Sequence, residues 1–253
     1  MGDREFISFS GGVESTTMAL MFGHKATPIF ADTGFEHPEM YERLDHVEKV
    51  LRGVHGNSFK VVRVVPDETL PAYIRRMKFY PSPVARFCTR MFKIEPMDAF
   101  LSGQGECELM IGLNADERDR TGNHGLQPNV TYTYPLIDLG ITRLDCVALL
   151  QEYKLEPRLP IYMKRGGCVG CFFKSREELQ AMVHLARDQI DGLVELERAI
   201  QDKRGKHFGI LTKAKGPLAE FIASEENTLF NADELYPNQI VENHTPCGVF
   251  CHR

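Results

Sequence analysis

The chain of 253 residues has no tryptophan and no apolar run of the about 20 residues that a membrane-spanning helix needs. Its first residues, 1–5, lack the basic and then apolar regions of a secretory signal peptide. Basic residues are not in excess either, because the formal net charge is −5. These absences argue against an exported protein, a membrane partner and a wholly basic surface, although a local basic patch is compatible with them. We expect a cytoplasmic protein.

Disulfide bonds are also not expected, although seven cysteines are present, because cytosolic thiols stay reduced. A clustered subset of these cysteines therefore predicts metal binding or redox chemistry. Cys107 and Cys146 lie in apolar surroundings and are expected to be buried as small hydrophobic residues.

The first third of the chain alternates short apolar runs with helical patterns, which indicates right-handed crossovers and a parallel sheet. The patterns predict strands over 5–9, 27–31, 60–65 and 109–113, and helices over 14–22, 38–51, 89–101, 142–153 and 175–201. The last helix carries a break near Gly192, residues 114–130 form a loop, and the last ~40 residues are irregular. We therefore predict an α/β fold with a doubly wound, mostly parallel sheet and helices on both faces. Residues 1–140 are expected to form this sheet domain, and residues 141–253 a helical and loop appendage that carries cysteines.

A glycine-rich turn, Ser10-Gly11-Gly12-Val13-Glu14-Ser15, follows the first expected strand and opens the first expected helix. Such a turn directs free backbone N–H groups at one point, and its glycines allow a phosphate to approach closely. Ser10, Ser15 and Thr16 add hydroxyl donors. The lysine of the P-loop nucleotide triphosphatases is absent, so the turn is not of that type. The alternative is a strand-to-helix turn with good capping residues and no ligand.

Two further groups of polar residues are candidates for the same site. Asp32, Thr33 and Gly34 follow the second expected strand, and ligands of open α/β sheets bind at the carboxyl ends of strands. Their alternative role is a helix-capping turn. The second group, Arg86, Arg90 and Lys93, suits a phosphate or sulfate clamp, because arginine offers a bidentate fork. Its alternative role is a solvated helix face.

The paired cysteines Cys168 and Cys171 form a C-x-x-C segment that follows two glycines. This spacing suits two ligands of one zinc ion or one iron–sulfur cluster. A thioredoxin-like redox pair is the competing interpretation. It requires a strand before the pair and a helix that starts at it, and residues 160–165 do not show a clear strand pattern.

Five segments in order resemble the PAPS reductase-like family of the PP-loop ATP pyrophosphatases, the adenine nucleotide alpha-hydrolase-like superfamily. Residues 10–15 resemble its SGGxxS loop, and residues 32–36 its D-T-G-x-E/F element. Residues 87–96 are similar to its C-x-x-x-x-K-x-x-P helix start, residues 111–118 to its I-G-x-R-x-x-E element, and residues 167–171 to its late C-x-x-C. The resemblance covers residues 5–175. Asn114 stands where the family often has arginine, so Arg118 or Arg120 would supply that charge, and Val13 stands where ATP-using members often have lysine.

The resemblance implies the residues of a nucleotide site and of a metal site. The implied nucleotide-binding residues are Ser8, Ser10, Gly11, Gly12, Glu14, Ser15, Thr16, Asp32, Thr33, Gly34, Arg86, Arg90 and Gly112. Lys93 and Arg118 are implied as catalytic residues, together with a tail thiol, Cys247 or Cys251. Cys88, Cys168 and Cys171, with Cys247 or Cys251 as the fourth ligand, are implied to hold a [4Fe–4S] cluster; zinc or unmetallated thiols are the alternatives. The tail matches only in part the E-C-G-x-H ending of the sulfonucleotide reductases.

Three functions follow from this resemblance. The first is cleavage of ATP, with Mg²⁺, between the α and β phosphates, so that an adenylated acceptor such as a nucleic acid takes sulfur from a donor. The second is a PAPS or APS reductase with a C-terminal cysteine nucleophile and a thioredoxin-like reductant. The third is a nucleotide-binding accessory protein without catalysis. The intact double glycine and Ser15 favour the first, the cysteines favour the second, and Asn114 with the altered tail leaves the third open.

Overall fold

A parallel sheet of five strands forms the centre of the molecule, which is a computed structural model describing residues 4–121, 127–164, 167–226 and 232–242. The strands are β1 (Arg4–Ser8), β2 (Ala26–Ala31), β3 (Val62–Val64), β4 (Cys107–Met110) and β5 (Val130–Thr133). Their order is β3-β2-β1-β4-β5, and every neighbouring pair is parallel. The order reverses between β1 and β4, and in doubly wound sheets this point is where ligands bind.

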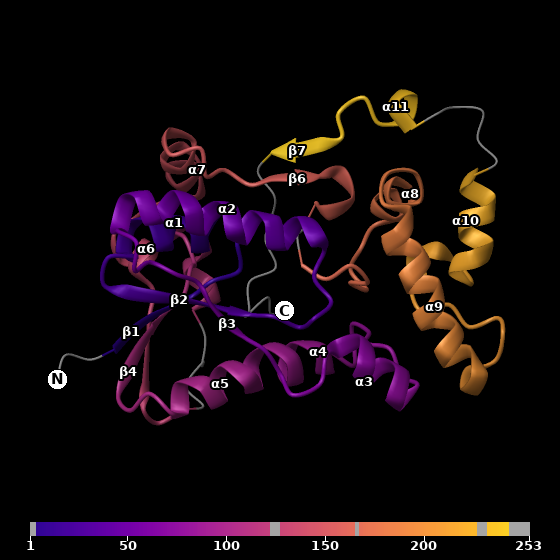
Figure 1. Cartoon of the computed structure of the whole chain (residues 1–253), viewed down its shortest axis with the longest axis horizontal. Coiled ribbons are helices and arrows are strands. Elements are labelled where there is room, and N and C mark those ends of the chain that lie inside the picture. Colours follow the sequence, from indigo (N-terminus) through magenta and orange to yellow (C-terminus); the bar gives the residue numbers. More distant parts are fainter. Residues whose placement is uncertain (1–3, 122–126, 165–166, 227–231, 243–253) are drawn as a thin grey trace.

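Helices cover both faces of the sheet (Figure 1). Helices α1 (Val13–Phe22) and α2 (Pro38–His55) lie on one face, and α5 (Glu95–Ser102) lies on the other. Strands covered on both faces carry continuous apolar runs, as Phe6 and Ile7 of β1 do with exposures of 5% and 0%. The predicted α/β fold with a doubly wound parallel sheet is therefore confirmed.

The helix predicted over 89–101 is present but locally widened. It consists of α4 (Phe87–Thr89), a π-helical segment (Arg90–Ile94) and α5. The backbone N–H of Glu95 bonds to the carbonyl of Arg90, five residues earlier. Pro96 explains this, because its ring would clash with the carbonyl of Phe92 in a regular α-helix. The widened turn carries Lys93, and π-bulges are frequent at functional sites.

The C-terminal part adds a helical pair and a two-stranded sheet. Its elements are α7 (Arg143–Glu152), β6 (Arg158–Pro160), α8 (Arg176–Leu185), α9 (Arg187–Arg204), α10 (Leu218–Glu226), α11 (Ala232–Leu235) and β7 (Ile240–Glu242). The break in the helix predicted over 175–201 lies at Ala186 (φ −143°, ψ 53°), so the prediction of a break near Gly192 was wrong. Gly192 costs helix stability but breaks no hydrogen bond, whereas Ala186 ends α8 and starts α9.

Several short elements were missed by pattern alone. Helix α3 (Leu70–Met77) starts at Thr69, whose hydroxyl accepts the N–H of Ala72 at 3.4 Å. The segment predicted as a loop contains a 3₁₀-helix (Ala115–Arg120) and leads into β5, and a short α6 (Pro135–Asp138) follows. The tail expected to be irregular contains α10 and β7. These elements have too few residues for a hydrophobic period to be recognised.

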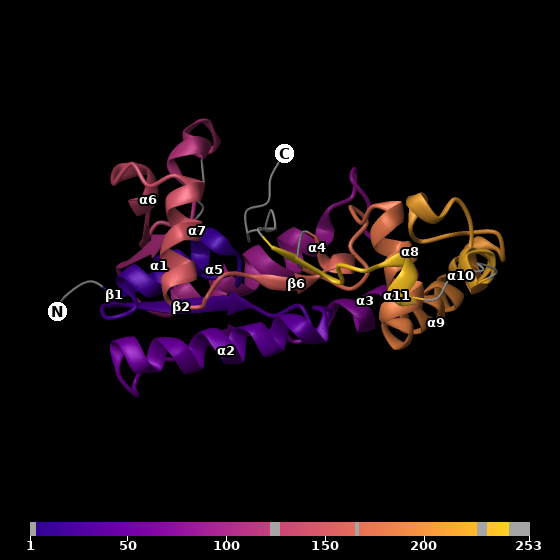
Figure 2. The same ribbon diagram turned by 90° about the horizontal axis from the view of Figure 1, so that it is seen from above.

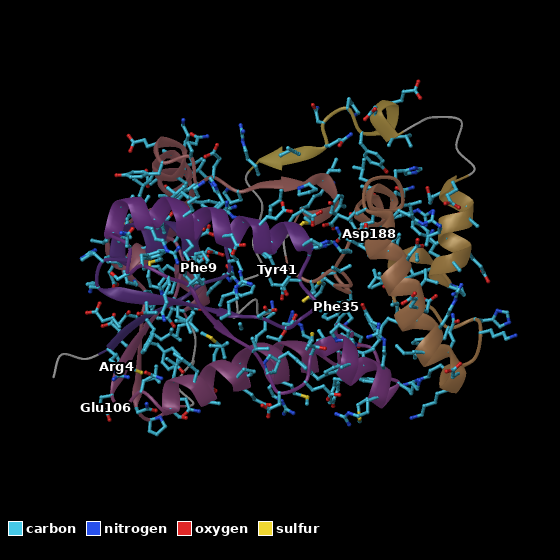
Figure 3. The ribbon with its side chains drawn as sticks, in the orientation of Figure 1. Arg4, Phe9, Phe35, Tyr41, Glu106 and Asp188 are labelled. Atoms are coloured by element: carbon cyan, nitrogen blue, oxygen red, sulfur yellow. The ribbon has the colours of Figure 1, made fainter. Side chains whose placement is uncertain are left out.

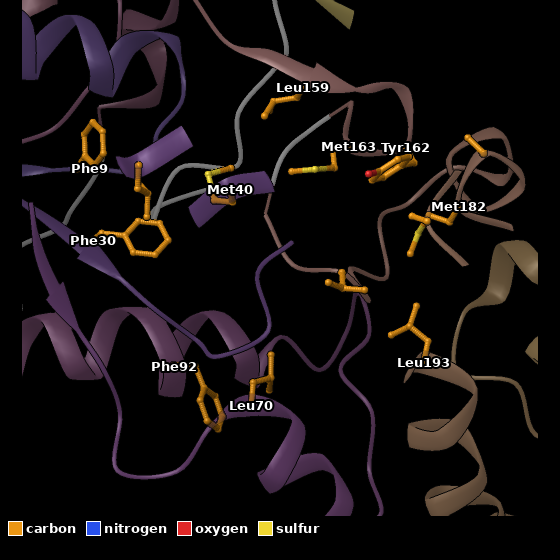
Figure 4. Close-up of a cluster of buried hydrophobic side chains, with 14 of the residues drawn as sticks. Phe9, Phe30, Met40, Leu70, Phe92, Leu159, Tyr162, Met163, Met182 and Leu193 are labelled. Carbon is orange, nitrogen blue, oxygen red and sulfur yellow. The ribbon is translucent and has the colours of Figure 1, made fainter. Parts of the chain in front are cut away.

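One hydrophobic core runs from the sheet into the helical pair (Figure 4). Phe9 and Phe30 lie beside the sheet, Met163 lies between the two parts, and Met182 and Leu193 come from α8 and α9. Cys107 and Cys146 are buried, as predicted, with exposures of 4% and 0%. The division at residue 140 stays a prediction. Among the described helices, none is both long and apolar enough to cross a membrane.

Candidate functional site

The glycine-rich turn joins β1 to α1 at the point where the strand order reverses. Gly11 has φ +74°, a conformation that side-chain-bearing residues rarely adopt. Gly12 has an extended backbone and precedes the first residue of α1, Val13. The first N–H groups of a helix have no partner within it and carry the positive end of the helix dipole. The turn therefore presents backbone donors at the carboxyl edge of the sheet, which suits an anionic ligand.

Two serine hydroxyls close the turn. The backbone N–H of Ser10 donates to Ser15 Oγ at 3.2 Å, and the two hydroxyl oxygens lie 3.1 Å apart. The N–H of Gly12 donates to Ser10 Oγ at 3.4 Å. Both predicted hydroxyls are thus held within the turn itself, and Ser8 lies just before it, 7% exposed.

Arg43 of α2 supports the turn from behind and was not found by sequence reasoning. Its side chain is buried; Nε donates to the carbonyl of Gly11, and Nη2 donates to Thr16 Oγ1 at 3.2 Å and to Leu155 O at 2.9 Å. Burial lowers the pKa of Arg43 to about 10, so the guanidinium stays charged at neutral pH. Arg43 thus fixes the carbonyl of Gly11 and joins the turn to Thr16 and to Leu155. The sequence did contain a sign of this role, because Arg43 is a charged residue on the apolar face of α2. The other buried residues of that face are Met40, Leu44, Val47 and Leu51.

A second group of side chains fixes the first turn of α1. Glu14 is 3% exposed, and its Oε1 accepts Asn114 Nδ2 at 3.1 Å and also pairs with Arg143. Asn114 stands where the family often has arginine, and it thus binds α1, the helix that follows the glycine-rich turn. Gly112 lies so close that a Cβ atom there would be 3.2 Å from the backbone N of Ser15. Gly112 thus follows β4 in tight contact with the first turn of α1, and Arg143 is a second residue that sequence reasoning missed.

The Asp32-Thr33-Gly34 segment forms a bonded turn after β2. Asp32 Oδ1 accepts the N–H of Gly34 at 2.9 Å and the hydroxyl of Tyr41 at 2.7 Å. Thr33 Oγ1 donates to Glu36 Oε1 at 3.0 Å. Phe35 and Tyr41 lie at the end of the sheet that faces α8 and α9 (Figure 3). These side-chain bonds stay within the segment or reach Tyr41, and α2, which follows, has His37 at its N-cap with no side-chain cap. The binding role of the segment stays a prediction.

Glu36 connects this edge to the C-x-x-C segment. Its side chain is 2% exposed, and Oε1 lies 3.7 Å from Lys93 Nζ and accepts Cys168 Sγ at 3.5 Å. Glu36 and Cys168 also form an isolated antiparallel bridge, and Val169 N donates to Phe35 O at 2.8 Å. The structure thus brings the predicted Lys93 and Cys168 together through Glu36, which belongs to the 32–36 element but was not among the predicted site residues.

The C-x-x-C segment is a tight turn, not the start of a helix. Cys171 N donates to Cys168 O at 3.2 Å, and α8 begins only at Arg176. This geometry does not provide the helix start that the thioredoxin-like interpretation requires. Gly170 is packed so closely that a Cβ atom would lie 2.1 Å from Tyr80 Oη, and Tyr80 donates its hydroxyl to the carbonyl of Gly170.

The three described candidate ligand thiols lie near one tyrosine. Burial raises the pKa of Tyr80 well above its usual value, and electrostatic interaction with Cys171, Cys168 and Cys88 adds to this shift. Burial raises the pKa of Cys88 and Cys171, and it raises that of Cys168 well above its usual value, with Glu36 as the next cause. Within the described residues, no three histidine, cysteine or acidic side chains are arranged to hold a metal ion. Cys247 and Cys251 lie outside the described residues.

The remaining predicted cations lie on the surface around this edge. The guanidinium of Arg86 lies 5.2 Å over the ring of Phe173. Arg90 is exposed and its Nε lies 3.2 Å from Glu95 Oε1. Arg118 is exposed on the 3₁₀-helix Ala115–Arg120. No common ligand of these arginines is defined by the geometry, so the predicted clamp stays a prediction.

One small cleft joins the glycine-rich turn to the cysteine segment. It is lined by Phe9, Ser10, Phe30, Ala31, Glu36, Met40, Lys93 and Gly167. The hydroxyl of Ser10, the ammonium of Lys93 and the turn before Cys168 therefore belong to one site. The space itself is about 10 Å³, room for a single water molecule, so the cleft shows which residues are neighbours and is not itself a nucleotide pocket. The glycine-rich turn at the carboxyl edge of a doubly wound sheet is the feature typical of nucleotide-binding α/β proteins.

Comparison with known proteins identifies the family. The profile of the phosphoadenosine phosphosulfate reductase domain matches residues 4–176. This is more than half of the chain, and the chain belongs to that family. The crystal structure of the phosphoadenylyl-sulfate (PAPS) reductase of Candida auris, a phosphate complex, is similar with a TM-score of 0.45 and 13% identity, over 61% of this chain and 73% of that one. That similarity is too low to transfer any activity. No curated protein matches the chain.

Proposed function

We propose that this PP-loop protein binds ATP at the turn 10–15 and cleaves it between the α and β phosphates in a sulfur-transfer reaction. The observation that carries the proposal is the intact turn: Gly11 in its left-handed conformation, Ser10 and Ser15 bonded across it, and Arg43 behind it. Backbone donors fixed in this way stabilise charge that develops on phosphate oxygens.

The chemistry proceeds in two displacements. An acceptor oxygen attacks the α phosphorus, the bond to the bridging oxygen of the β phosphate breaks, and pyrophosphate leaves with that electron pair. A sulfur donor then displaces AMP from the acceptor. The N–H groups of the turn and the hydroxyls of Ser10 and Ser15 would hold the phosphates, Lys93 and Arg118 would neutralise charge, and Mg²⁺ would accompany ATP.

A PAPS or APS reductase is the second candidate, because Ser10 of the turn and Gly167, which precedes Cys168, line the same small cleft, and Glu36 of that cleft pairs with Cys168. In that reaction the thiolate of Cys247 or Cys251 attacks the sulfate sulfur, the sulfur–oxygen bond to the nucleotide phosphate breaks, and the nucleotide leaves. A thioredoxin-like reductant then reduces the resulting S-sulfocysteine and releases sulfite.

A metal cofactor is part of the proposal on the basis of donor type. Cys88, Cys168 and Cys171, with Cys247 or Cys251, would hold a [4Fe–4S] cluster, or zinc in its place, since thiolates suit both. The interaction of Cys88, Cys168 and Cys171 with the same residue, Tyr80, supports a shared site for these thiols. The described residues alone do not assemble a metal site. Such a group would tie the C-x-x-C turn to the helix start at Cys88.

Anaerobic calorimetry with ATP and with PAPS tests the nucleotide. We expect ATP with Mg²⁺ to bind and pyrophosphate to form when a sulfur donor and acceptor are supplied. Gly12→Val should weaken binding by about 1.5–3 kcal/mol for each phosphate hydrogen bond lost. Gly53→Val is the matched control, because Gly53 lies in α2 with no atom within 4 Å of its added Cβ. Unchanged affinity in folded Gly12→Val protein would refute the PP-loop assignment, and PAPS binding without ATP binding would favour the reductase.

Elemental analysis of protein purified without air tests the cofactor. A [4Fe–4S] cluster predicts about four iron atoms per chain, a brown colour and broad absorption near ~400 nm. Cys168→Ser should bleach the protein, whereas Cys107→Ser, at a buried thiol of the sheet, should not. Stoichiometric zinc without iron would show that the cysteines hold zinc and not an iron–sulfur cluster.

A further inference from the structure

A strongly basic segment stands out in an acidic chain. Between Thr69 and Ile94 there are six basic side chains and no acidic one, although the net charge of the protein is −5. The segment comprises α3, the loop to α4, and the π-helical turn. Figure 2 shows that the loop between α3 and α4 projects past α4. The basic residues are Arg75, Arg76, Lys78, Arg86, Arg90 and Lys93.

Aromatic rings lie among these cations. The rings of Phe79 and Phe87 are 5.7 Å apart, and those of Tyr73 and Phe87 are 5.4 Å apart. Phe79 is 38% exposed. Arg76 lies 5.0 Å over Tyr73, and Arg204, from the end of α9, lies 5.7 Å over Phe79. The rings therefore form a row that is accessible at Phe79 and flanked by guanidinium groups.

Acidic neighbours offset only part of this charge. Arg76 pairs with Glu68 at 2.7 Å, and Lys78 Nζ lies 3.8 Å from Asp202. Arg90 pairs with Glu95, while Arg75 and Arg204 are exposed. The surface formed by Tyr73, Arg75, Lys78, Phe79, Phe87 and Arg204, which we call the α3 surface, therefore combines net positive charge with exposed aromatic carbon.

We propose that the α3 surface binds single-stranded nucleic acid. Cations that follow the phosphate backbone and rings on which bases stack are the combination that such binding uses. In a duplex the faces of the bases are covered by stacking and only their edges are accessible in the grooves, so the aromatic row favours a single strand. The proposal goes beyond the proposed function, because this binding requires neither the PP-loop nor the cysteines.

Fluorescence anisotropy with a labelled single-stranded DNA oligomer, measured at several salt concentrations, tests the proposal. We expect binding that weakens as salt rises. Arg75→Ser with Arg204→Ser should reduce the slope of log affinity against log salt by about 1.4, which is the value for two phosphate contacts to a single strand. Phe79→Leu should weaken binding about tenfold at constant salt and leave the slope unchanged. The matched control is Lys49→Ser with Lys60→Ser. It removes two exposed charges outside the α3 surface, one in α2 and one in the segment that follows α2.

Three outcomes would overturn the proposal: no binding at low salt, equal binding of heparin with no effect of Phe79→Leu, or an equal loss in the control variant. Circular dichroism checks that each variant is folded. Gly12→Val should bind the oligomer as the parent does, so failure of the PP-loop assignment and failure of this proposal are distinguishable.

Discussion

Gly170 occupies a position that tolerates no larger residue. A Cβ atom there would lie 2.1 Å from Tyr80 Oη, 2.8 Å from Leu193 Cδ2 and 2.8 Å from Phe35 Cζ. We predict that Gly170→Ala lowers the free energy of unfolding by about 1–3 kcal/mol, because overpacking forces these groups apart. Gly192→Ala is the control, since Gly192 is open, exposed and helical, and alanine should stabilise it by about 0.5–1 kcal/mol. Urea denaturation of both variants measures the difference, and equal stabilities would contradict the packing described.

His37 predicts a pH dependence of stability. Its imidazole is 0% exposed, and burial, followed by the charge of Lys174, lowers its pKa to about 2. Nδ1 contacts Gln189 Oε1 at 2.5 Å, while Nε2 meets no partner among the described residues. Below the ordinary histidine pKa of about 6.5 the unfolded chain binds a proton that the folded chain does not. Stability is therefore fully present above that pH and falls as the pH is lowered, by up to about 1.4 kcal/mol per pH unit.

We predict that His37→Gln removes this contribution. The amide can still bond to Gln189 but does not titrate, so the loss of stability between neutral and mildly acid pH should be smaller in the variant. Urea denaturation at a series of pH values measures it. Parallel pH profiles for parent and variant would show that the buried imidazole does not set the dependence.

At the scale of elements, Glu197 joins α9 to the segment that leads into α10. It is 1% exposed, and it accepts the backbone N–H groups of Ile210 at 2.9 Å and Leu218 at 2.7 Å. Burial raises the pKa of this carboxyl. We predict that Glu197→Ala costs about 2–6 kcal/mol, because two buried N–H groups lose their acceptor. Glu197→Gln keeps one oxygen and should cost less. Thermal unfolding of both variants tests this, and equal losses would indicate that packing alone matters.

Hydrophobic patterns gave the long elements because each needs only its own residues. Helix α2 and strand β2 were predicted close to their observed bounds, 38–55 and 26–31. The break at Ala186 and the π-helical turn were not predicted. Both depend on what the chain packs against and on how Pro96 displaces bonds within an existing helix.

At the scale of the molecule, the described core ends before the tail. Its last member in sequence is Ile222, from α10. We predict that truncation after Asn243 leaves the far-ultraviolet circular dichroism unchanged but abolishes turnover, because it removes Cys247 and Cys251 and none of the described core residues. Retained turnover would exclude an essential role for Cys247 and Cys251.

The sequence by itself determined the order of the motifs, the parallel α/β architecture and the glycine-rich turn. These depend on local chemistry: a glycine-rich turn between an apolar strand and a helical pattern is readable from neighbouring residues. Only the tertiary structure decided that Arg43 supports the turn, that Arg143 pairs with Glu14, and that Glu36 joins Lys93 to Cys168. Glu14 and Arg143 lie 129 positions apart, and Glu36 and Cys168 lie 132 apart. A charged side chain reveals its role only when folding removes it from water and leaves a single partner within reach, and no local pattern contains that information.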